Sequence, residues 1–168
     1  MLESAYLNSL IARAKQDVKT IVLPEGEDER ILKAAHLITA EKAAKVIILG
    51  DVESVKKHFA GHNWSLEDIE LVDPAKSANL EKYTKLLYEL RKEKGMTEEE
   101  AAKTVLNPNY FGTLMIKAGD ADGMVSGANH STADTVRPAL QIIKSAKKGA
   151  SVSSLLILSL IHISEPTR

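Results

Sequence analysis

The sequence has no cysteine, few aromatic residues and no long hydrophobic run. Without cysteine the chain cannot form disulfides, use a thiolate nucleophile or ligate a metal through sulfur, and this fits a reducing compartment. The longest apolar run, residues 155–161, is interrupted by Ser159 and is far shorter than the roughly 20 residues of a membrane-spanning helix. The N-terminal segment is amphipathic and interrupted by charged residues, so it lacks the uninterrupted apolar core of a signal peptide. We therefore expect a cytoplasmic protein that does not enter a membrane.

Positively and negatively charged residues are almost equal in number. The 168 residues include 22 Lys and Arg against 23 Asp and Glu, which gives a formal net charge of −1. This balance provides no overall positive field for nucleic acid or an anionic membrane, so any anion site must be local. Hydrophobic residues make up 44% of the chain and charged residues 27%. Both values are typical of a globular domain with one core.

Short β-branched and apolar runs alternate with segments of helical periodicity. We expect strands at residues 20–23, 45–49, 69–72 and 121–125. We expect helices at residues 3–16, 31–38, 52–59, 76–94, 97–105 and 109–117. The helix that starts after Thr97 has the pattern of a capping box with Glu100. Repeated strand and helix units predict an α/β fold of three layers, α/β/α, with a mostly parallel sheet.

Ligands of open α/β sheets bind beyond the carboxyl ends of the strands, and the loop after Val125 is the richest of these positions. It offers small, hydroxyl and imidazole side chains, and we take five of its residues as candidates for binding a phosphate or carboxylate: Ser126, Gly127, His130, Ser131 and Thr132. Glycine allows the backbone N–H groups to turn inward, and a following helix N-terminus adds partial positive charge. Arg137 supplies a guanidinium that can bind phosphate oxygens in pairs.

A purely structural explanation of this loop remains open. Ser131 or Thr132 can cap a helix with Pro138 in its first turn, and His130 can be a satisfied polar side chain. No second ligand stands at a useful spacing from His130, so we expect no metal. The acidic turn at residues 24–30 is expected to cap the next helix, with its proline and glycine shaping a cleft wall.

The familiar nucleotide-binding loops are missing, since the sequence contains neither GxGxxG after a strand nor GxxxxGK[ST]. Arg91 begins the basic run 91–94, which by its composition is typical of a solvated helix end. Physical reasoning from the sequence alone gives Arg91 no further role.

Four segments resemble the phosphate acetyl/butyryl transferase family: IVLPEGEDERILKAAH, KVIILGD, ELRKEKGMTEEEA and NPNYFGTLMIKAGDADGMVSGANHSTADTVRPALQ. The resemblance implies a fold like that of the isocitrate and isopropylmalate dehydrogenases, with two α/β domains and a cleft between them. It also implies that Arg91 and Arg137 are active-site arginines and that the loop from Ser126 to Thr132 binds the substrate.

The activity implied by this resemblance is the transfer of an acetyl group between acetyl phosphate and coenzyme A. Coenzyme A or acetyl-CoA is then a co-substrate, no cofactor stays bound, and the arginines hold phosphate while the coenzyme A thiolate attacks the carbonyl. The implied full-length protein is a homodimer. Two alternatives remain open, a butyryl-type acyltransferase and a phosphate-binding module without turnover. A dehydrogenase is disfavoured because no dinucleotide segment is present.

The domain boundaries follow from the same resemblance and from a candidate hinge at residues 147–150. We expect residues 1–150 to form the N-terminal α/β domain and residues 151–157 to begin a truncated second domain. Residues 158–168 do not continue the family pattern and look like translated sequencing-adapter sequence, so we expect a non-native tail. With the second domain missing, the fragment is expected to be inactive alone.

Overall fold

The structure is a computed structural model and describes residues 5–143. In this part of the chain the sheet has four strands: β1 (Lys19–Leu23), β2 (Ala44–Leu49), β3 (Ile69–Val72) and β4 (Gly123–Met124). Every pair of neighbours is parallel, and the order across the sheet is β3-β2-β1-β4. The predicted α/β class with a parallel sheet is confirmed.

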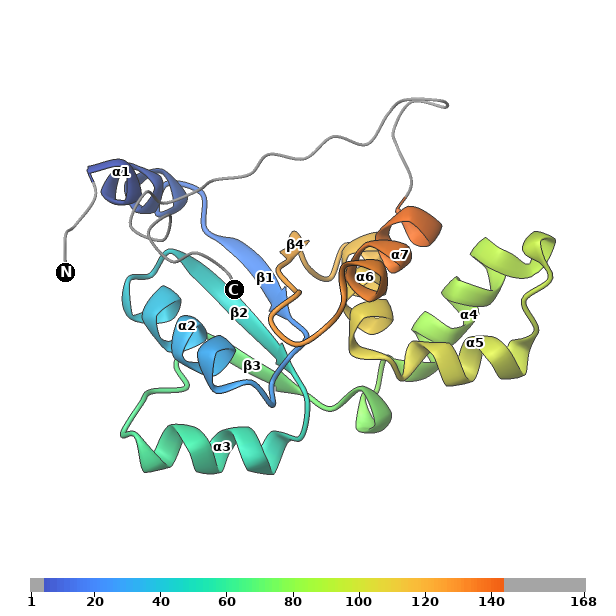
Figure 1. Cartoon of the computed structure of the whole chain (residues 1–168), viewed down its shortest axis with the longest axis horizontal. Coiled ribbons are helices and arrows are strands. Elements are labelled where there is room, and N and C mark those ends of the chain that lie inside the picture. The colour runs from blue at the N-terminus through green and yellow to red at the C-terminus, as the bar shows by residue number, and fades with distance from the viewer. Residues whose placement is uncertain (1–4, 144–168) are drawn as a thin grey trace, which may run out of the picture.

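Helices lie on both faces of this sheet (Figure 1). The helices are α1 (Ala5–Ala14), α2 (Glu29–Ala40), α3 (Val52–Gly61), α4 (Leu80–Arg91), α5 (Glu98–Val105), α6 (Pro108–Ala118) and α7 (Thr132–Ile142), with 3-10 turns η1 (Pro74–Lys76) and η2 (Lys92–Lys94). One face packs on α2 and α3, and the other packs on α6, with α4, α5 and α7 packed together beyond it. The molecule therefore has the three layers expected from the sequence.

The starts of five helices in this fold are fixed by short polar side chains. The N-cap side chains of α2, α3, α5, α6 and α7 each accept a hydrogen bond from a backbone N–H of the first turn, which satisfies a group that has no partner inside the helix. At α5 the capping box is complete, since Thr97 accepts from the Glu100 N–H and the Glu100 carboxylate accepts from the Thr97 N–H. This capping box was predicted and is confirmed.

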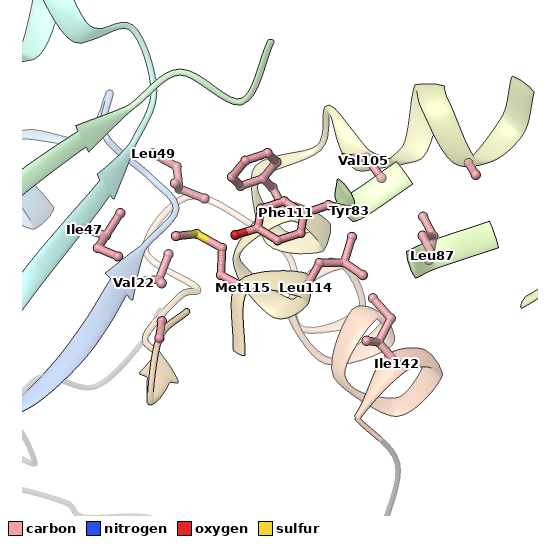
Figure 2. Close-up of a cluster of buried hydrophobic side chains, with 12 residues drawn as sticks. Val22, Ile47, Leu49, Tyr83, Leu87, Val105, Phe111, Leu114, Met115 and Ile142 are labelled. Carbon is pink, nitrogen blue, oxygen red and sulfur yellow. The ribbon is translucent and has the colours of Figure 1, made fainter. Parts of the chain in front are cut away.

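The larger core fills the face of the sheet toward α6 (Figure 2). Tyr83 of α4 and Phe111 of α6 meet edge to face, with ring centroids 4.9 Å apart. The Tyr83 hydroxyl donates to Asp120 over 2.7 Å, so its polar end is satisfied. At Gly112 an added Cβ would lie only 2.7 Å from the Met124 sulfur, which shows how closely α6 approaches the sheet.

A second core lies on the opposite face, beneath α2 and α3. It contains Leu23, Leu32, Ala35, Val46, Ile48, Val55 and Phe59, all buried. Successive strand residues alternate between the two cores, as the pleat of a strand requires. The two-sided burial explains why the strands are almost continuously apolar in sequence.

Some expected boundaries are wrong. The helix expected at 76–94 starts later, because the 3-10 turn η1 precedes α4. The strand expected at 121–125 pairs with β1 only through the two residues of β4. Pro138 lies inside α7 rather than in its first turn. Along α1, Leu7 stays 54% exposed, so this helix packs less fully on the body than its periodicity predicted.

The predictions for residues 144–168 concern a part of the chain outside the described residues. These are the hinge at 147–150, the end of the domain expected at 1–150, the second-domain segment at 151–157 with its apolar run 155–161, and the tail at 158–168.

Candidate active site

The parallel pairing of β1 with β4 brings two distant segments together at one edge of the sheet. Ile21 pairs with Gly123 and Val22 with Met124, and the Val125 N–H donates to the Val22 carbonyl over 3.0 Å. The turn after β1 therefore faces the loop after β4, at the carboxyl ends of both strands. This is the edge at which parallel α/β proteins bind ligands.

Glu25 of the first segment is fully buried and reaches into the second. Its Oε2 accepts from the N–H groups of Gly127 (3.1 Å) and Ala128 (3.0 Å). Its Oε1 accepts from the N–H groups of Asn129 (2.7 Å) and His130 (3.0 Å), and the His130 imidazole donates through Nδ1 at 2.7 Å. One carboxylate thus binds four consecutive amides of the loop.

The charge of Glu25 is stabilised by these donors. Burial by itself raises the pKa of the carboxyl group, but the Asn129 N–H, the His130 imidazole and the N–H groups of Ala128 and Gly127 act in the opposite direction. The net effect is a pKa below the ordinary value, so Glu25 is an anion at neutral pH.

The loop amides are therefore not free for a phosphate, which differs from the expectation that Gly127 and its neighbours turn their N–H groups toward a ligand. The acidic turn was expected only to cap a helix. Asp28 does cap α2, whereas Glu25 binds the loop instead. The N–H groups of Thr132 and Ala133, at the start of α7, have no acceptor among residues 5–143.

Two candidate hydroxyl groups are used within the protein. Ser126 Oγ donates to the Oδ1 of buried Asn109 over 2.7 Å. Ser131 is the N-cap of α7, and its hydroxyl both donates to the Asp134 carboxylate and accepts from the Asp134 N–H. The capping interpretation of Ser131 is thus confirmed, while Thr132 is exposed at the first position of the helix.

The two candidate arginines lie on helices that pack against α6. Arg91 ends α4 and Arg137 lies on α7, and both helices contact α6, which carries Tyr110. Burial raises the pKa of the Tyr110 hydroxyl, while the positive charges of Arg137 and then Arg91 lower it, with a net rise. Both guanidinium groups are therefore within electrostatic reach of Tyr110. The Arg91 Nε is buried and has no partner among the described residues.

Sequence reasoning missed two residues that shape this site. One is Glu25, and the other is Arg30, whose Nη2 donates to the Ala128 carbonyl over 2.8 Å. Asp28 orients that guanidinium through contacts of 3.0 and 2.6 Å. For Glu25 the available signal was a carboxylate two residues after a buried strand, but this signal could not reveal which loop lies opposite.

Neither a metal site nor a membrane-spanning helix is present between residues 5 and 143. In that stretch no three side chains of His, Asp or Glu are grouped so that they could hold a metal ion. The same stretch holds no helix that is both long enough and apolar enough to span a membrane.

The fold and the site together describe an α/β protein with a small-residue loop and two arginines at the carboxyl end of a parallel sheet, a combination suited to an anionic ligand. The family model described as phosphate acetyl/butaryl transferase matches residues 5–164. The chain belongs to this family.

Individual relatives of this chain support the same family assignment. The chain is 46% identical over 156 residues to the phosphate acetyltransferase of Helicobacter pylori, which covers 93% of this chain and 30% of that protein. It is 49% identical over 154 residues to the phosphate acetyltransferase of Acetivibrio thermocellus, covering 92% of this chain and 46% of the relative. The chain therefore spans less than half the length of these relatives.

Solved structures that resemble this chain support the same family assignment. The EutD phosphotransacetylase from Staphylococcus aureus superposes with a TM-score of 0.76 at 47% identity, over 87% of this chain and 44% of that one. A phosphotransacetylase from Streptococcus pyogenes gives a TM-score of 0.74 at 41% identity, over 81% and 42% of the two chains.

Proposed function

We propose that this chain is the N-terminal α/β domain, residues 1–150, of an acyltransferase that moves an acetyl group between acetyl phosphate and coenzyme A. Membership of the family and the names of the relatives support this activity. Acetyl is favoured over butyryl because the two relatives described above are named phosphate acetyltransferase. The full-length protein is expected to be a homodimer in the cytoplasm.

The observation that carries the proposal is the packing of α4, which ends at Arg91, and of α7, which carries Arg137, on α6. The loop after β4 meets the same helix α6 through the hydrogen bond from Ser126 to Asn109. Two guanidinium groups from different helices provide the charge and the paired N–H donors that a phosphoryl group needs. Because Glu25 occupies the amides of residues 127–130, we assign phosphate to the arginines, Thr132 and the N–H groups at the start of α7, which have no acceptor among residues 5–143.

The chemistry requires no residue of this chain to become covalently modified. The coenzyme A thiolate attacks the acetyl carbonyl carbon, a C–S bond forms, and the bond from that carbon to the phosphate oxygen breaks. Phosphate leaves with the electron pair. Fixed positive charge at Arg91 and Arg137 stabilises the phosphate as its charge develops. Coenzyme A is a co-substrate in this scheme.

A full-length chimera tests the proposal. In it, residues 5–143 of this chain replace the segment that they match in the Staphylococcus aureus EutD phosphotransacetylase. We expect coenzyme A-dependent turnover of acetyl phosphate, and a lower kcat/KM for acetyl phosphate, by about 10- to 100-fold, in Arg137→Ala, since a hydrogen bond to a charged group contributes about 1.5–3 kcal/mol. Arg137→Lys should recover only part of the loss.

The matched control is Arg13→Ala, which removes an exposed arginine of α1 and should leave the kinetics unchanged. Equal kcat/KM for Arg137→Ala and the unsubstituted chimera would contradict the assignment of Arg137. Faster turnover of butyryl phosphate than of acetyl phosphate would favour the butyryl-type enzyme. The 168-residue chain alone should show no turnover, and turnover by it would exclude a purely phosphate-binding role.

A further inference from the structure

We infer that Glu25 is a positioning residue of this site, which fixes the shape of the loop from Gly127 to His130 and the orientation of the His130 imidazole. The inference rests on the proposed function for its kinetic consequence. Its structural part concerns only residues of this chain.

The binding capacity of the carboxylate is used completely. A carboxylate offers about four lone-pair positions, and five N–H donors surround Glu25. A buried charge of this kind is costly unless it is paired. All five partners are donors, so a neutral glutamine would turn its own NH2 group toward at least one of them. The position therefore requires a carboxylate and not merely a polar side chain.

Glu25 is unsuited to act as a base itself. Its side chain is 0% exposed, and its lone pairs already face donors on the loop, so a substrate proton has no path to them. Its effect on a ligand must pass through the groups that it holds.

One of these groups is His130. A carboxylate can only accept, so the His130 Nδ1 must carry the proton that it shares with Glu25 at 2.7 Å. In the neutral imidazole this leaves Nε2 without a proton, on a side chain that is 23% exposed. Glu25 therefore determines which nitrogen of His130 can meet a ligand.

The second group is the loop backbone, which is held from both sides. The Glu25 carboxylate accepts hydrogen bonds from the loop N–H groups, and the Arg30 guanidinium donates to the Ala128 carbonyl over 2.8 Å. The next residue, Ser131, is the N-cap of α7, and α7 carries Arg137. The place where α7 begins, and with it the position of Arg137, depends on the loop that Glu25 holds.

Hydrogen exchange on the 168-residue chain tests the structural part. In Glu25→Gln we expect the amides of residues 127–130 to exchange at least about tenfold faster, because each loses a charged acceptor. The matched control is Glu27→Gln, two residues away on the same turn and exposed, which should leave these rates unchanged. Unchanged exchange in Glu25→Gln would overturn the inference.

A second measurement needs no substitution and so does not depend on the variant folding. Nitrogen-15 spectra of the unsubstituted chain should show His130 protonated at Nδ1 and bare at Nε2 at a pH where the imidazole is neutral. The opposite tautomer would overturn the inference, because Glu25 could not then accept from His130.

Kinetics in the full-length chimera test the consequence for the site. Glu25→Gln should raise the KM for acetyl phosphate by about tenfold or more, corresponding to about 1.4 kcal/mol, with a smaller change in the KM for coenzyme A. Glu25→Asp keeps the charge and should recover part of the loss. A chimera that is active and indifferent to Glu25→Gln would overturn the positioning role. An inactive chimera would overturn the proposed function, and the exchange and tautomer results would still decide the role of Glu25 in the loop.

Discussion

Tyr110 donates its hydroxyl hydrogen to the Gln141 Oε1 over 2.9 Å and thereby joins α6 to α7. Gln141 lies four residues after Arg137, on the same face of α7. The bond therefore anchors the stretch of α7 from which one of the two candidate arginines projects. Because the phenol is partly buried, this contact is shielded from water that would otherwise compete for it.

Replacing Tyr110 with phenylalanine should lower the free energy of unfolding of this chain by about 0.5–1.5 kcal/mol, since the ring still packs but the Gln141 oxygen loses its donor. Urea denaturation measures the difference. Tyr6→Phe is the matched control, because the Tyr6 side chain is 57% exposed and should contribute little. An equal stability of Tyr110→Phe and the unsubstituted chain would show that the bond between α6 and α7 contributes nothing.

Gly26 should tolerate no side chain. A Cβ at this position would lie 2.6 Å from the Leu49 carbonyl oxygen and 2.8 Å from the Ile48 Cγ2. Neither the backbone of β2 nor the buried isoleucine side chain can move away without a cost in stability. We expect Gly26→Ala to lower the free energy of unfolding by about 1–3 kcal/mol, as overpacking does in well-packed cores. Thermal denaturation of Gly26→Ala and of the parent chain measures the difference in stability.

The control for Gly26→Ala is Gly61→Ala, at the end of α3, where an added Cβ meets nothing within 4 Å. Alanine there should leave stability unchanged or raise it by up to about 1 kcal/mol through its helix propensity. A melting temperature of Gly26→Ala at or above that of the parent chain would contradict the close approach of the turn to β2.

Stability should depend on pH through Asp28. The Arg30 guanidinium beside it lowers the pKa of this carboxyl group by more than burial raises it, and with the Arg30 N–H brings the pKa to about 2 from 3.8. Because the folded pKa is the lower one, the carboxylate stabilises the fold above about pH 4, and this contribution is lost as the pH falls toward about 2.

Asp28→Asn isolates this effect, since asparagine caps a helix about as well as aspartate but carries no charge. The parent chain should be the more stable protein at neutral pH, and the difference should narrow once the pH falls below about 4. Urea titrations at successive pH values measure it. A difference that stays constant, or that grows toward acid pH, would contradict the depressed pKa of Asp28.

Much of the fold could be predicted from local sequence. Strands such as β2 are short apolar runs closed by a turn, and the capping box of Thr97 and Glu100 depends on residues three positions apart. Both features depend on residues close together in the chain, so the sequence alone is sufficient to predict them. Local sequence also located the loop after β4, because small, amide and hydroxyl residues follow one another there from Ser126 to Thr132.

The pairing inside the site could not be predicted in this way. Glu25 and Gly127 are 102 positions apart, and they meet because β4 adds to β1 on the side opposite β2. The order of strands depends on how whole layers pack, which no short pattern encodes. For the same reason, the sequence could not reveal that Arg91, at the end of α4, lies near Tyr110.

The pairing of β4 with β1 has a consequence for the order of folding. β1 and β2 are joined by one short crossover, whereas β4 reaches β1 only after every other strand and the helices α2 to α6 have been passed. Closing that long loop costs more chain entropy, and only two residues of β4 pair once it is closed. We therefore expect β1, β2 and β3 to assemble first, and the loop of the candidate site to become structured late and to be released early when the domain unfolds.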